Sequence, residues 1–195
     1  MIRLRVLSRA VGVVGTVLSS VASAQNPPPP GAQTPAAPLP PATKLEAFKP
    51  AAGTVVTVAY NELGGILGVS VDAREIRDNR GNVVRGVVVE VTQSQYREER
   101  AFVDADEIPE LLRGIDALLE VKSNPTTYQK FEVRYSTKGE LQLTAFGTTG
   151  GRTRYAIQAG RFTRAQAFTD EDGLRKLRAM FETAGQQLGA PARNN

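Results

Sequence analysis

Carboxylates are the residues of this sequence whose types and spacing could do chemistry. They gather in the segment AFVDADEIPELLRG, residues 101–114, and in the charged run just before it, as Glu98, Glu99, Asp104, Asp106 and Glu107. Two carboxylates that face each other can act as the acid and the base or nucleophile of a hydrolase. Glu98, Glu99 and Asp104 are therefore the candidate catalytic residues of a carboxylate-dependent hydrolase.

Composition excludes most other chemistry. The 195 residues contain no cysteine and no histidine. A thiol nucleophile, a disulfide, a lipid-modified cysteine, a Ser-His-Asp triad and a histidine-based zinc site all require one of these two residues. Calcium needs only oxygen ligands, but neither acidic segment has the DxDxDG loop with a glutamate at its twelfth position. We expect no metal and no cofactor.

The apolar pattern around the carboxylates predicts antiparallel strands followed by a helix. Alternating β-branched residues and Gly/Asn turns indicate strands at 54–60, 66–76, 83–93 and, more briefly, 100–103. An Ile/Leu stripe with helical spacing then runs from Ile108 to Leu119. The same order recurs over 129–188. The predicted fold class is α+β, with two tandem ββββα units, each an antiparallel sheet with one amphipathic helix packed on it.

A repeat underlies this order. Residues 87–111, VVVEVTQSQYREERAFVDADEIPEL, align without a gap with TRYAIQAGRFTRAQAFTDEDGLRKL, 66 positions later. The preceding hairpin matches at an offset of 75, with Val58 on Val133 and Tyr60 on Tyr135. Internal similarity of this kind predicts a duplicated unit.

The repeat gives the acids a structural interpretation. Each acidic cluster lies after a strand and before an apolar stripe, where Asp and Thr oxygens cap helices by accepting hydrogen bonds from free backbone N–H groups. We predict Asp104 and Asp106 as cap residues of the first helix, and Thr169 and Asp170 as those of the second. On this interpretation Asp106→Ala costs about 1 kcal/mol, and calcium leaves the melting temperature unchanged.

The N-terminus has the pattern of a secretory signal peptide. Three arginines precede an apolar run at 10–21, and Ala-Ser-Ala at 22–24 supplies a cleavage site. The run is too short for a transmembrane helix. We predict that residues 1–24 are removed, that the protein is exported to the periplasm or beyond, and that its mature form has no transmembrane span. Removal of the three arginines lowers the net charge from +4 to +1.

A Pro/Ala-rich stretch separates this signal from the folded part. Residues 25–52 have the composition of a disordered, extended linker. The duplicated domain is expected at 53–190, with halves at about 53–124 and 125–190, and residues 191–195 are expected to be a disordered tail.

Two consecutive ββββα units, over residues 54–188, resemble the repeat plan of Pur-alpha and whirly-type proteins. The resemblance implies paired repeats with curved sheets, and binding of single-stranded nucleic acid. However, the mature charge is nearly neutral and the strands lack basic residues interleaved with several aromatics, so nucleic acid is an unexpected partner. The stacking candidates on the early strands are Tyr60, Tyr128, Phe131 and Tyr135.

The leading functional hypothesis is an exported, non-enzymatic domain that binds a ligand or belongs to the cell envelope. In this respect the chain is similar to small secreted bacterial proteins that carry domains of unknown function. A protein or envelope component is the expected partner, and the ligand itself is left unknown. The alternatives are a single-stranded nucleic-acid-binding module and the carboxylate-dependent hydrolase.

Overall fold

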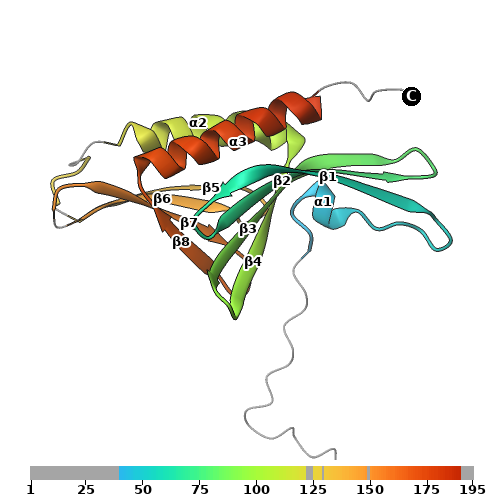
Figure 1. The fold of residues 1–195 in the computed structure, drawn as a ribbon, viewed down its shortest axis with the longest axis horizontal. Helices are drawn as coiled ribbons and strands as arrows, with labels where there is room; N and C mark the ends of the chain where they lie inside the picture. Colours follow the sequence, from blue (N-terminus) through green and yellow to red (C-terminus); the bar gives the residue numbers. More distant parts are fainter. Residues whose placement is uncertain (1–39, 122–124, 129, 149, 190–195) are drawn as a thin grey trace, which may run out of the picture. The chain divides into compact units, whose positions relative to one another are not determined.

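Two four-stranded antiparallel sheets, each followed by a helix, make up the folded chain (Figure 1). The structure is a computed structural model and describes residues 40–121, 125–128, 130–148 and 150–189. The first sheet contains β1 (Val56–Ile66), β2 (Val69–Asp78), β3 (Val83–Ser94) and β4 (Arg97–Asp104). The second contains β5 (Glu132–Ser136), β6 (Gln142–Gly147), β7 (Thr153–Ala159) and β8 (Ala165–Thr169).

The helices follow the sheets in the expected order. A short 3-10 turn, η1 (Ala105–Glu107), leads from β4 into α2 (Ile108–Leu119), and α3 (Glu171–Gly189) follows β8. The α+β class and the twofold ββββα order are thereby confirmed. The predicted signal peptide, most of the predicted linker and the predicted tail lie outside the described residues.

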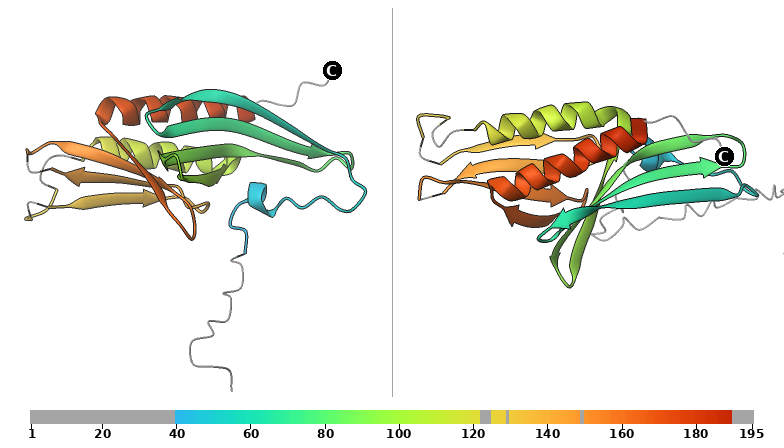
Figure 2. Two further views of the ribbon diagram at one scale, coloured as in Figure 1. Left: turned by 60° about the horizontal axis from the view of Figure 1, so that its bottom comes forward. Right: turned by 45° about the horizontal axis from the view of Figure 1, so that its top comes forward.

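Each long helix packs on the sheet of the other half. The helix α2 contacts β5 and β6, whereas α3 contacts β1, β2 and β3 as well as β7 and β8 of its own sheet. The two helices lie side by side over the sheets (Figures 1 and 2). Their apolar stripes join both sheets in a single core cluster, in which Leu111 of α2 and Phe181 of α3 are fully buried. Because the helices are exchanged in this way, neither half closes a core by itself.

The strand registers follow the repeat alignment only in part. In the segment aligned at 66 residues, Val91 of β3 pairs with Glu99, whereas Ile157 of β7 pairs with Ala167, so β8 is shifted by two residues from the position that the offset predicts. The 75-residue offset for the first hairpins is wrong. Tyr135 lies next to the β5–β6 turn, opposite Leu143, whereas Tyr60 lies far from the β1–β2 turn. The reason is that β1 has 11 residues and β5 only 5.

The C-terminal part of the expected linker is folded. It contains a short helix, α1 (Lys44–Ala47), with a capping box in which Thr43 and Glu46 each accept a backbone hydrogen bond from the other. Such reciprocal pairs stabilise the first turn of a helix. Leu45 is buried against β3, where a Cβ at Gly86 would lie 2.6 Å from its Cδ1. The expectation of a disordered linker as far as residue 52 is therefore corrected for this segment.

Candidate functional site

The candidate catalytic carboxylates are kept apart. Glu98 and Glu99 are neighbours on β4, so their side chains leave opposite faces of the sheet. Glu98 pairs with Arg100 at 3.5 Å, and Glu99 accepts a hydrogen bond from the Thr163 hydroxyl. Asp104 lies roughly 20 Å from Glu98 along β4, given a rise of about 3.3 Å per residue. The three do not form the facing pair that hydrolysis by two carboxylates requires.

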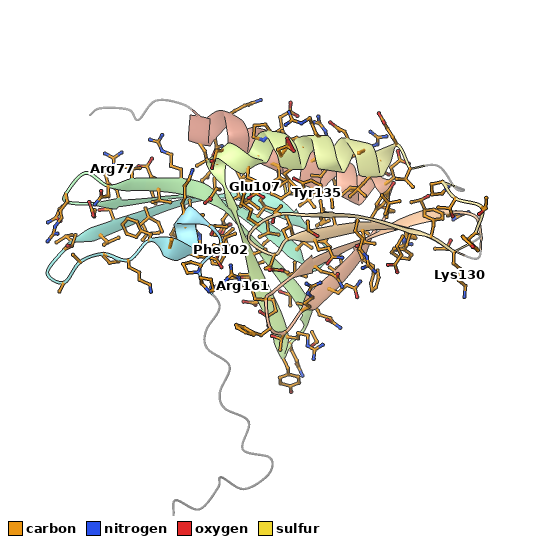
Figure 3. The ribbon with its side chains drawn as sticks, turned by 180° about the vertical axis from the view of Figure 1, so that it is seen from behind. Arg77, Phe102, Glu107, Lys130, Tyr135 and Arg161 are labelled. Carbon is orange, nitrogen blue, oxygen red and sulfur yellow. The ribbon has the colours of Figure 1, made fainter. Side chains whose placement is uncertain are left out.

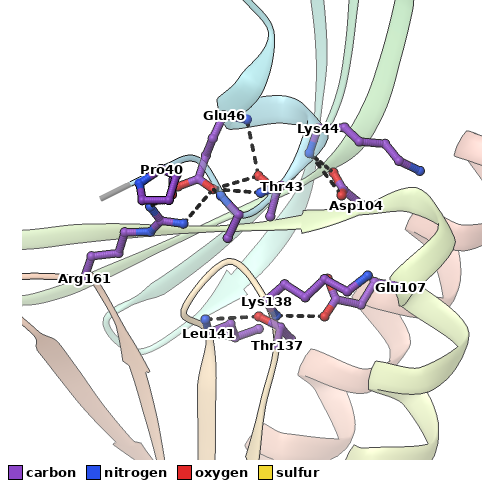
Figure 4. A network of polar contacts seen from close by, with 11 residues as sticks. Pro40, Thr43, Lys44, Glu46, Asp104, Glu107, Thr137, Lys138, Leu141 and Arg161 are labelled. Carbon is purple, nitrogen blue, oxygen red and sulfur yellow. Dashed lines mark hydrogen bonds and ion pairs between the residues drawn. The ribbon is translucent and has the colours of Figure 1, made fainter. Parts of the chain in front are cut away.

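Asp104 caps a helix, but not the helix that follows it. Both of its carboxylate oxygens accept hydrogen bonds from the backbone N–H of Lys44, at 2.9 and 3.1 Å, so it caps α1 from the end of β4 (Figure 4). Asp106 also differs from its expected role, because its carboxylate forms an exposed ion pair with the Lys44 ammonium at 2.8 Å. The pKa of Asp106 is lowered by this contact.

The start of α2 has no side-chain cap. Its N-cap residue is Glu107, which is the last residue of η1 and has helical rather than extended backbone angles. Pro109 at the second helical position has no N–H that would need a partner. The buried carboxylate of Glu107 instead accepts from the backbone N–H of Lys138, at 2.9 Å, and so ties α2 to the β5–β6 turn (Figure 4).

The second helix is capped by one of the two expected residues. Asp170 accepts a hydrogen bond from the backbone N–H of Gly173 at 3.0 Å, in the first turn of α3. Thr169 ends β8, and its carbonyl accepts from the Arg154 guanidinium at 3.2 Å. In the part of the chain that the structure describes, no group of three Asp or Glu residues is placed to hold a metal ion.

The outer face of the second sheet carries a different kind of candidate site. This face is turned away from α2 and α3 and is hollowed by about 450 Å³, which we call the β5–β8 hollow. Cross-strand pairing arranges its side chains in rows. One row contains Glu132 and Phe146, the next Arg134, Thr144, Ala156 and Phe168, and the third Gln142, Gln158 and Gln166. Arg164 completes the lining.

Two aromatic rings form the apolar part of the β5–β8 hollow. Phe146 and Phe168 meet edge to face, with ring centroids 6.0 Å apart and an interplanar angle of 78°. Phe168 is 52% exposed, although it lies on a strand whose other face is in the core. Its counterpart in the first half, Phe102, lies beside α1 and the β5–β6 turn, and its backbone N–H bonds to the Gly139 carbonyl at 3.2 Å (Figure 3).

The polar part of the hollow is rich in amides and close to neutral. Each glutamine amide supplies both donors and an acceptor. Gln142 accepts from the Arg164 guanidinium at 2.7 Å and donates to the Thr144 hydroxyl at 3.4 Å. The arginines have acidic neighbours, since Arg134 pairs with Glu132 and Arg164 lies 3.6 Å from Glu140.

The sequence pattern gave no reason to choose the lining residues of the β5–β8 hollow as a site. The stacking candidates on early strands lie elsewhere: Tyr135 faces α2, where burial raises its pKa and its ring fills the space beside Gly114 (Figure 3), and Phe131 is also buried. The residues of the hollow do alternate with core residues in QLTAF, RYAIQ and RAQAF. That alternation marks the outer face of a sheet, but the same pattern accompanies any solvated sheet.

Comparison of the chain with models of known protein families gave no match, and comparison with curated proteins gave none either. Among the described residues, no helix has both the length and the apolar character needed to cross a bilayer.

Proposed function

We propose that this protein is an exported, non-enzymatic binding domain that holds a chain of sugar rings in the β5–β8 hollow. The observation that carries the proposal is the exposed Phe168, set against Phe146 and flanked by the row Gln142, Gln158 and Gln166. Ligand sites combine apolar surface with a few convergent polar groups, and this face has both.

Sugar rings fit the chemistry of this face. The apolar face of a sugar ring can lie on an aromatic side chain, while its hydroxyl groups both donate and accept hydrogen bonds. Glutamine amides and the Thr144 hydroxyl carry both donors and acceptors, and can hydrogen-bond to these hydroxyl groups. Glycans of the cell envelope are polymers of such rings, and an exported protein would meet them.

Two alternatives receive less support. Single-stranded nucleic acid is held by cationic grooves and stacked bases, and the arginines of the hollow have acidic partners at Glu132 and Glu140. A carboxylate-dependent hydrolase would need Glu98, Glu99 or Asp104 to face one another, and β4 keeps them apart.

The test is a binding titration of the full chain, expressed with its own leader, against short soluble chito-oligosaccharides and against a single-stranded oligonucleotide. We expect saturable binding of the oligosaccharide that changes little with salt. Phe168→Ala and Gln158→Ala should each weaken it, and Phe162→Ala should not, because Phe162 is 74% exposed but lies in the β7–β8 turn outside the hollow.

Three results would contradict the proposal. They are absence of oligosaccharide binding, binding that Phe168→Ala leaves unchanged, and preferential binding of the oligonucleotide with a steep salt dependence. The last would favour the nucleic-acid alternative. Unchanged circular dichroism spectra of the three variants would exclude misfolding as the cause of any loss.

A further inference from the structure

The outer edge of β1 is long and carries a single charge, Glu62. Within the described residues β1 pairs with β2 alone and forms the first edge of its sheet. It has 11 residues, and none of those from Val56 to Asn61 carries a charge. An edge strand with these properties pairs readily with another chain, because its free N–H and C=O groups form a template.

The other three sheet edges are protected. The strand β4 carries the charged run from Arg97 to Arg100, and its Phe102 N–H donates a hydrogen bond to the Gly139 carbonyl. The strands β5 and β8 have 5 residues each. β5 carries Glu132 and Arg134, and the Gln93 side chain bonds to the Gln166 N–H of β8 at 3.2 Å. Charge, short length and covering groups are the usual protection of edges. β1 is long, its segment Val56–Asn61 carries no charge, and the side-chain contact from α3 reaches it at Asn61, through Gln187.

An exposed apolar patch adjoins this edge. Val58 and Tyr60 are 51% and 69% exposed, and they lie on the face of the first sheet that α1 touches through Leu45 and Gly86. Val58 continues across the sheet in the row Ile76 and Val84, both only partly buried. A clustered apolar patch at a free edge is the mark of an interaction surface.

We infer that β1 pairs with β1 of a second copy of this chain, antiparallel and about a twofold axis, so that two first sheets form one continuous sheet. The regular part of β1 ends at the bulge between Glu62 and Gly64. Pairing of the whole regular segment, Val56–Glu62, with itself centres the twofold axis on Ala59.

This register makes the strand self-complementary. It places Val58 opposite Tyr60 of the second copy, twice, and aromatic with β-branched pairs stabilise antiparallel strands. The one charge of the segment, Glu62, then lies opposite Val56, so no like charges oppose each other. Closed twofold pairs are the commonest form of oligomer, and the inference does not depend on the proposed ligand.

Sedimentation velocity of the full chain, expressed with its own leader, tests the inference. The chain should form a concentration-dependent dimer, and the variant V58K/Y60K should be monomeric. Both side chains are exposed, so at dilutions at which the wild type is monomeric the two chains should unfold at the same temperature. The matched control is Leu67→Lys, at the β1–β2 hairpin tip and 90% exposed, which should remain dimeric. A wild-type chain that stays monomeric at all soluble concentrations, or a dimer that survives V58K/Y60K, would overturn the inference.

Because the chain has no cysteine, single cysteines test the register. Directly opposed antiparallel residues lie about 4.5–5.5 Å apart between Cα atoms, within the range that a disulfide bridges. Ala59→Cys should therefore form a covalent dimer under mild oxidation, and Glu132→Cys, on the edge of β5, should not. Equal cross-linking of both variants, or of Glu132→Cys alone, would overturn pairing through β1.

Discussion

The backbone N–H of Lys44 lies 2.9 and 3.1 Å from the two carboxylate oxygens of Asp104, although 60 residues separate them in the chain. This contact fixes α1 to the end of β4. On the other side of α1, the Arg161 guanidinium of the second half bonds to the Pro40 carbonyl at 2.8 Å and pairs with Glu46 at 3.3 Å (Figure 4). The segment before the first sheet therefore links both halves of the domain.

Replacement of Asp104 and of Asp106 should change stability to different extents. Asp104→Ala removes the buried acceptor of the α1 N-terminus and should lower the free energy of unfolding by about 1 kcal/mol. Asp106→Ala removes an exposed ion pair and should change it by less than about 0.5 kcal/mol. Urea unfolding measures both values. An equal or larger effect of Asp106→Ala would restore the capping role that its position in the sequence suggested.

The ion pair between α2 and α3 should make stability depend on acid pH. The Arg178 guanidinium contacts Asp116 at 2.6 and 3.0 Å and lowers the pKa of that carboxyl. A carboxylate whose pKa falls on folding adds stability above its unfolded pKa of about 3.9, and the contribution is lost as the pH falls through the folded value. The melting temperature of Asp116→Asn should therefore lie below that of the wild type at neutral pH.

This difference should begin to shrink as the pH falls below about 4, where the unfolded carboxyl takes up its proton, and should vanish below the lowered pKa of the folded carboxyl. Glu110→Gln is the control, because Glu110 pairs with Arg113 within α2 and is exposed. Its melting temperature should follow the wild type throughout. A difference for Asp116→Asn that persisted in acid would show that the lost charge is not its cause.

The exchange of helices predicts that the halves depend on each other. A chain ending after α2 leaves the first sheet without α3, and a chain beginning before β5 leaves the second sheet without α2. Expressed separately, neither half should unfold cooperatively, and mixing should restore a single transition in circular dichroism. Cooperative unfolding of one half alone would contradict the interlocked core.

Local patterns were sufficient to predict most elements. The alternation of Val87, Val89 and Val91 predicts one buried face of β3, and all three are fully buried. The stripe that begins at Ile108 predicts the buried side of α2. Such patterns indicate that a face is buried but not which element covers it. They therefore could not predict that α2 packs on the second sheet and α3 on the first.

Long-range partners explain the remaining differences. The acceptor of Lys44 is Asp104, and no local spacing relates the two residues. Thr43 and Glu46 have the Thr-x-x-Glu spacing of a capping box in the sequence, but the surrounding prolines favoured the prediction of a linker. Gln142, Gln158 and Gln166 become a row only through the strand registers, because they belong to three strands.

Export can be tested at the N-terminus of the protein in culture. The leader pattern predicts cleavage after Ala24, so the mature chain should begin at Gln25. Mass spectrometry of the protein recovered from the periplasm and the medium measures this end. An intact Met1 on protein that stays in the cytoplasm would contradict export and would remove the reason to consider envelope glycans.

The measurement that tests the proposed binding site most directly is an NMR titration of the full chain with chito-oligosaccharide, followed at the side-chain amides. We expect saturable shifts for Gln142, Gln158 and Gln166 and for the Phe146 and Phe168 rings. No shift is expected at Gln187, which bonds to Asn61 and does not line the hollow. Shifts confined to Gln187 and α3, or no shifts in the hollow at saturating oligosaccharide, would contradict it.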